Sequence, residues 1–94
     1  MTELEAASLR AIADSAESAA TLAVLGDGDG AKSALERAQH RLEEFANGRP
    51  WHGRALRLAR EAVARSELLV AGGKRGIKRR ARSVARASAR TKSL

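Results

Sequence analysis

Residues 26–50 read GDGDGAKSALERAQHRLEEFANGRP, a stretch in which one helical pattern lies between two glycine-containing turns. Its apolar residues recur every three or four positions and occupy about a third of a helix circumference. They are Ala31, Ala34, Leu35, Ala38, Leu42 and Phe45. Asp29 can cap the start of such a helix, and Asn47-Gly48 can end it with the glycine in the left-handed conformation. The sequence therefore predicts a helix over residues 31–46.

Glycines divide the rest of the chain in the same way. They cluster in residues 26–30, at Gly48 just before Pro50, and at Gly72-Gly73. Between these clusters the apolar residues keep a helical spacing, and no segment shows the alternating pattern typical of a strand. The sequence therefore predicts an all-α fold: a small antiparallel bundle of three helices with a fourth, Arg-rich amphipathic helix at the carboxyl end.

The first and third helical segments each have an apolar face made mostly of alanine. In residues 2–25 this face consists of Leu9, Ile12, Ala16, Ala19, Ala20 and Ala23. In the third segment, which Pro50 can begin, it consists of Trp51, Ala55, Leu58, Ala59, Ala62, Ser66 and Leu69. Small side chains allow helices to approach closely. We expect Trp51 to anchor the core near Phe45.

The fourth segment combines a narrow apolar stripe with a basic face. The stripe consists of Ile77, Ala81, Val84 and Ser88. The opposite flank consists of Lys78, Arg79, Arg82, Arg86 and Arg90. A wholly solvated basic tail would not need such a stripe, so we expect a helix here, at least when a partner is bound. The sequence thus predicts a helical body over residues 1–73 and a basic helical segment over residues 74–94.

Charge is divided unequally along the chain. Residues 1–50 contain five basic and nine acidic side chains, whereas residues 51–94 contain thirteen basic and two acidic ones, so the halves carry −4 and +11. Residues 68–94 contain nine Lys or Arg and no Asp or Glu. A one-signed stretch of this kind favours a polyanionic partner.

Nucleic acid is the first polyanion to consider, because guanidinium groups stay charged and can donate two parallel hydrogen bonds to a phosphate. The predicted binding residues are Arg54, Arg57, Arg60, Lys74, Arg75, Lys78, Arg79, Arg82, Arg86 and Arg90. No residue among them marks a base-reading position, so non-specific contact with the phosphate backbone is expected. The basic segment also lacks the aromatic side chains on which unpaired bases stack.

Two other kinds of partner are consistent with the unequal charge of the two halves of the chain. The acidic and basic halves of neighbouring copies could meet in a structural or assembly protein, for example a subunit of a virion or another large particle, or they could dock on a different protein. An anionic membrane surface is less well supported, because the stripe of Ile77, Ala81 and Val84 lacks bulky anchors. No integral membrane association is expected, since no apolar run is long enough to span a bilayer.

The turn at residues 26–30 partly matches a calcium-binding loop. Asp27, Asp29 and Glu36 have the spacing of positions three, five and twelve of an EF-hand. However, Leu25 occupies the first ligand position, and Lys32 stands where an apolar residue normally packs. The expected role of the turn is to join two helices, with its Asp residues capping the second one.

Nothing in the sequence favours catalysis or a cofactor. His40 lies opposite the apolar stripe of its helix and His52 in a turn, so both are expected to be solvated surface groups. No serine lies in a nucleophile-elbow or phosphate-loop pattern. The chain has no Cys, which excludes a disulfide framework. The sequence predicts a cytoplasmic, non-catalytic protein that contains no metal.

Overall fold

The computed structural model describes residues 2–47 and 53–94, which form four helices and no strand. The helices are α1 (Glu3–Val24), α2 (Gly28–Ala46), α3 (Gly53–Ala71) and α4 (Ile77–Lys92). The prediction of an all-α fold is therefore confirmed. The expectations for Pro50, Trp51 and His52 concern positions outside the described residues.

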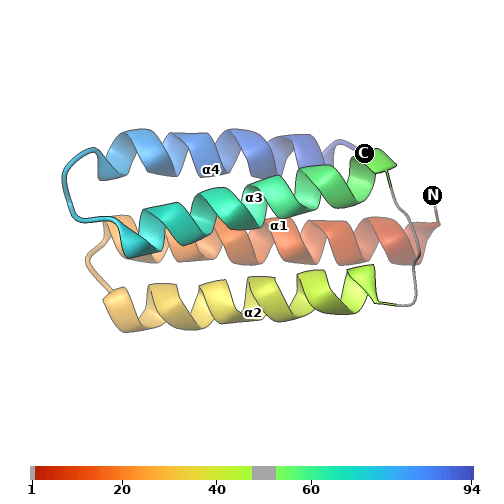
Figure 1. Ribbon diagram of the computed structural model, residues 1–94, viewed down its shortest axis with the longest axis horizontal. Coiled ribbons are helices and arrows are strands. Elements are labelled where there is room, and N and C mark those ends of the chain that lie inside the picture. Colours follow the sequence, from red (N-terminus) through yellow and green to blue (C-terminus); the bar gives the residue numbers. More distant parts are fainter. Residues whose placement is uncertain (1, 48–52) are drawn as a thin grey trace.

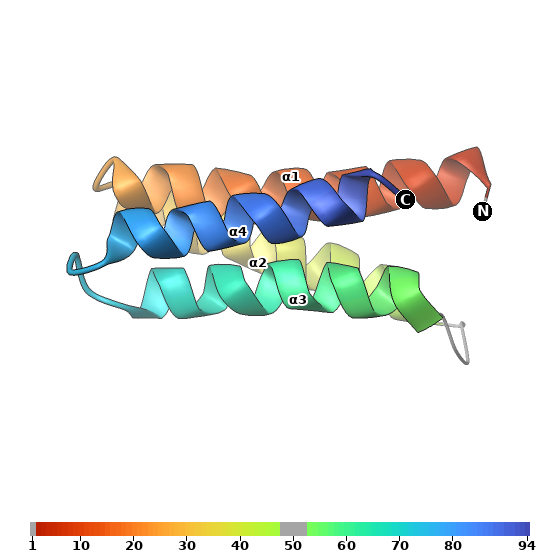
Figure 2. The same ribbon diagram turned by 90° about the horizontal axis from the view of Figure 1, so that it is seen from above.

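The four helices form a bundle in which each runs opposite to the one before it (Figure 1). Figure 1 shows α1 and α3 between α2 and α4, whereas the view from above shows α2 and α4 between α1 and α3 (Figure 2), so the four helices occupy the corners of the bundle. Helix α1 packs against all three other helices, and α3 likewise contacts α2 and α4. Both ends of the chain lie at the same end of the bundle (Figure 1).

Helix α1 begins at a capping box. The Thr2 hydroxyl accepts a hydrogen bond from the backbone N–H of Glu5, and the Glu5 carboxylate accepts one from the backbone N–H of Thr2. These bonds satisfy two of the N–H groups that a helix start leaves without a partner. Helix α2 is capped by Asp27, whose Oδ1 accepts a 2.9 Å hydrogen bond from the backbone N–H of Gly30. The cap is thus two residues earlier than the predicted Asp29, which lies in the first turn.

Helices α1 and α3 contact each other through small residues. Ala16 of α1 and Ala59, Ala62 and Ser66 of α3 are all fully buried. The Ser66 hydroxyl donates a hydrogen bond of 3.2 Å to the carbonyl of Ala16. This contact explains the alanine-rich faces, because a larger side chain here would push the two helices apart.

The core has two parts along the bundle axis. The first joins Leu9 and Ile12 of α1 with Phe45 of α2 and Leu56 and Val63 of α3. The second consists of Ala16, Ala20, Ala62, Leu69, Val84 and Ala87. Two members of this second part, Val84 and Ala87, come from α4 and are 0% and 1% exposed. Helix α4 therefore contributes buried residues to the same core as α1 and α3.

None of the four helices in the described part of the chain has the length and apolar content needed to cross a bilayer. The division into a body of residues 1–73 and a segment of residues 74–94 stays a prediction.

Candidate nucleic-acid interface

The basic side chains gather on the hairpin that α3 and α4 form. All ten predicted binding residues lie on these helices or the turn between them, and every one of the ten is exposed. Within residues 2–47 and 53–94, the charged group of none of the ten takes part in an ion pair or a hydrogen bond. The structure thus leaves ten cationic groups available to solvent on one half of the molecule.

Three other basic residues of the hairpin, none of them among the ten predicted binding residues, have partners within the fold. The first is Arg65 of α3, which forms an ion pair with Glu61 and donates a 3.0 Å hydrogen bond from Nη1 to the carbonyl of Ser83 in α4. This bond ties α3 to α4 and fixes which residues of the two helices lie at the same level.

The second is Arg80, which folds back onto the turn before α4. Its Nη1 donates a 2.7 Å hydrogen bond to the carbonyl of Arg75, and its Nη2 donates one to the carbonyl of Gly73. A Cβ added at Gly72 would lie 2.7 Å from Nη2 of Arg80, so glycine leaves room for the guanidinium. Helix α4 has no side-chain cap, because the residue before it, Gly76, has no side chain. The φ of Gly76 is 72°, in the left-handed region. Arg80 therefore orders the turn and is not available to a ligand.

The third is Lys92, in the last turn of α4. Its ammonium lies 2.7 Å from Oδ1 of Asp14 and 2.7 Å from Oε1 of Glu17, both in α1. Hydrogen bonds to Asp14 and then Glu17 raise the pKa of Lys92 above its ordinary value of 10.5. A signal for this contact exists in the sequence: Lys92 follows Ala81 by eleven residues, a spacing that brings both to the same side of a helix.

The first turns of α3 and α4 carry positive charge, which is unfavourable at the N-terminus of a helix. Neither helix has an acidic residue in its first turn, whereas α1 and α2 both do. Instead Arg54 lies at the start of α3, and Lys78 and Arg79 at the start of α4. A positive charge near a helix N-terminus opposes the helix dipole, at a typical cost of about 0.3–1 kcal/mol. A basic surface kept against this local preference is typical of a functional site.

Spacing along α4 adds further repulsion. Arg82, Arg86 and Arg90 follow one another at intervals of four residues and are all exposed. Like charges at this interval destabilise a helix by about 0.2–0.5 kcal/mol per pair. A bound polyanion would remove this repulsion, so the same residues that weaken the free helix would favour binding.

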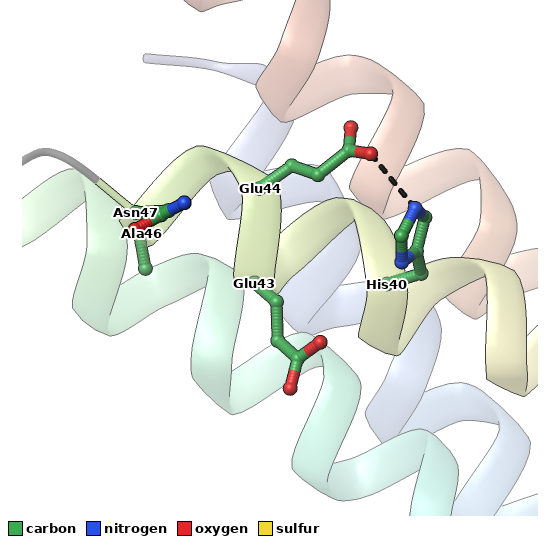
Figure 3. A pocket seen from close by; sticks show the side chains of 5 residues that line it. All are labelled: His40, Glu43, Glu44, Ala46 and Asn47. Atoms are coloured by element: carbon green, nitrogen blue, oxygen red, sulfur yellow. Dashed lines mark ion pairs between the residues drawn. The ribbon is translucent and has the colours of Figure 1, made fainter.

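A concave surface lies at the carboxyl end of α2. It is an open hollow of about 550 Å³ lined by His40, Glu43, Glu44, Ala46 and Asn47 (Figure 3). Nε2 of His40 lies 2.7 Å from Oε1 of Glu44, and Glu43 points away from this pair (Figure 3). The His40 side chain is 71% exposed, as the sequence predicts for a surface group.

No metal site is formed by the described residues. They contain no group of three or more His, Cys, Asp or Glu side chains that could hold an ion. At the turn before α2, the helix already begins at Gly28, and the carboxylate of Asp27 is engaged in capping. The segment from Leu25 to Glu36 is therefore mostly helix and does not have the form of an EF-hand loop.

Comparison of the chain with protein-family models, curated proteins and solved structures returns no significant match. The functional argument therefore rests on the geometry of the basic hairpin.

Proposed function

We propose that this protein is a non-catalytic binding protein that contacts the phosphate backbone of nucleic acid through α4, with help from Arg54, Arg57 and Arg60 of α3. The main observation in support of this proposal is a difference among the basic residues of the α3–α4 hairpin. Arg65, Arg80 and Lys92 are engaged in the fold, whereas the charged groups of ten exposed basic residues have no partner among the described residues.

The binding mechanism is electrostatic. Each arginine that contacts a phosphate displaces condensed counterions, and the entropy of their release favours the complex. The guanidinium also donates two hydrogen bonds to phosphate oxygens. Two of the exposed positions on α4, Ala85 and Ala89, carry only methyl groups, which offer no hydrogen bond to a base edge. Affinity is therefore expected to depend little on nucleotide sequence.

The test compares two triple variants that each lower the net charge from +7 to +4. The first replaces Arg82, Arg86 and Arg90 of α4 with Gln. The second, a matched control, replaces three exposed residues of α1 and α2, namely Arg10, Lys32 and Arg37, with Gln. The proposal expects the α4 variant to lose most of its affinity for labelled duplex DNA and structured RNA. The control variant should keep most of it. Helicity measured by circular dichroism should be unchanged in both.

Equal affinities for the wild type and the α4 variant would overturn the proposal. The alternative, self-association or protein docking through the acidic and basic halves, would instead give oligomers that dissociate as salt is raised. This alternative is less well supported, because several carboxylates of the acidic half already have partners within the fold. Asp14 and Glu17 bind Lys92, Asp27 caps α2, and Glu44 binds His40.

A further inference from the structure

We infer that the ligand is a duplex and that it lies across the junction of α3 and α4, not along α4 alone. This inference rests on the proposed function and names the face and the kind of nucleic acid that it uses. The seam face is defined here as the exposed arginines on both sides of the α3–α4 junction: Arg54, Arg57, Arg79, Arg86 and Arg90.

The hydrogen bond between Arg65 and Ser83 marks where this junction lies. Arg65 belongs to α3 and the Ser83 carbonyl to α4, with 3.0 Å between Nη1 and the oxygen. On α4, Arg79 precedes Ser83 by four residues, Arg86 follows it by three and Arg90 by seven, spacings that return to the same side of a helix. These three arginines therefore lie on the flank of α4 that borders α3.

The matching flank of α3 is found in the same way. Arg54 precedes Arg65 by eleven residues, and Arg57 precedes it by eight, so both point to the α4 side or to the outer surface. The carboxylate on this flank, Glu61, is already paired with Arg65. Because α3 and α4 are antiparallel, Arg54 and Arg57 at the start of α3 lie near Arg90 at the end of α4 (Figure 1).

The other flank of α4 is a poorer site for an anion. Ala81 and Ala85 face α1 there and share an apolar hollow of about 230 Å³ with Glu17 and Thr21. Lys78 belongs to this flank, because it precedes Ala81 by three residues and Ala85 by seven. Asp14 and Glu17 share the single cation Lys92, which leaves one net negative charge on this flank, whereas Glu61 on the other flank is matched by Arg65. A polyanion on α4 is therefore directed toward α3.

Arg60 lies outside the seam face for a similar reason. It follows Leu56 by four residues and precedes Val63 by three. Leu56 and Val63 pack in the part of the core that contains Ala38 and Phe45 of α2. Arg60 is therefore turned toward α2, on the far side of α3 from the junction.

The seam face suits two strands of phosphates better than one. Neighbouring helices pack with axes about 8–10 Å apart, so the arginines of α3 and those of α4 extend from backbones at about that separation. The two backbones of a duplex border grooves about 6 and 12 Å wide, which brackets this separation. Residues 53–94 contain no aromatic side chain, so unpaired bases have nothing on which to stack.

Two triple variants with equal charge loss test the inference. R57Q/R79Q/R90Q removes three seam-face arginines, and R10Q/K32Q/R37Q removes three exposed cations of α1 and α2 that lie outside it. Arg82 and Arg86 stay in both. We expect the seam-face variant to bind duplex DNA at least about tenfold more weakly than the control variant. Its slope of log affinity against log salt should also become shallower by about 2.7, since each lost phosphate contact removes about 0.9.

The outcomes separate the inference from the proposed function. Equal losses in the two variants would overturn the seam face and leave phosphate binding intact. Single-stranded DNA bound as tightly as duplex would overturn the duplex assignment. If the wild type binds neither form at low salt, the proposed function fails, and the inference fails with it.

Discussion

The ammonium of Lys92 in the last turn of α4 lies 2.7 Å from Oδ1 of Asp14 in the middle of α1. Together with Glu17, Asp14 gives this cation two carboxylate partners on a neighbouring helix. The carboxyl end of the most basic helix is thereby held to the most acidic part of the bundle. The contact also explains why Lys92 does not extend the exposed basic face.

Stability should fall at high pH because of Lys92. Its pKa is raised in the folded state, so its contribution is fully present below the unfolded pKa and is lost as pH rises above 10.5 through the folded value. In Lys92→Arg the guanidinium stays charged, so the alkaline loss should be smaller than in the wild type. Urea unfolding at about pH 9 and about pH 12 measures both losses. The same alkaline loss in both proteins would contradict this role of Lys92.

The adjacent residues Arg79 and Arg80 should have opposite roles. Arg80→Gln removes two hydrogen bonds to carbonyls of the turn and should cost about 1–2 kcal/mol of stability, with little effect on binding. Arg79→Gln should change stability by less than about 0.5 kcal/mol and weaken binding to duplex DNA. Urea unfolding and fluorescence anisotropy, applied to both variants, test this pair. If only total charge matters, the two variants will lose affinity equally.

Two buried serines should respond oppositely to the same substitution. Ser88 is fully buried, and its hydroxyl has no hydrogen-bond partner among the described residues, so Ser88→Ala should raise stability by about 1 kcal/mol. Ser66→Ala removes the hydrogen bond to Ala16 and should lower stability by about 0.5–1 kcal/mol. Chemical denaturation gives both values. A destabilising Ser88→Ala would show that its hydroxyl has a partner in solution.

Helix α4 should unfold together with the rest of the bundle. Val84 is fully buried in the second part of the core, so Val84→Ala should cost about 2 kcal/mol and shift a single unfolding transition. Circular dichroism in urea follows all four helices at once. An early, separate transition that removes only part of the helical signal would instead support a body of residues 1–73 that folds without α4.

The helical pattern was predictable from the sequence because burial follows the 3.6-residue period. The stripe of α2 is an example: Ala31, Ala34, Ala38 and Phe45 are all buried. The cap of the same helix was not predictable with equal accuracy, because Asp27 and Asp29 alternate with glycines and either could cap it. Only the backbone course shows that Asp27 reaches the nitrogen of Gly30.

The candidate site shows a similar limit. Periodicity places Arg79, Arg82, Arg86 and Arg90 on the outer side of α4, and all four are exposed. It cannot show that Arg80 folds back onto its own turn, because that contact depends on the path of the chain at Gly72 and Gly73. It also cannot show which flank borders arginines of α3 and which borders carboxylates of α1. That distinction depends on tertiary packing.

The most direct test of phosphate binding is the affinity of the unmodified protein for labelled duplex DNA, measured by fluorescence anisotropy over a series of salt concentrations. If five arginines contact phosphates, log affinity should fall against log salt with a slope of about −4.5. Structured RNA measured in parallel should give a steep slope of the same sign. No binding at low salt, or binding that does not change with salt, would contradict a phosphate-contacting role for α4.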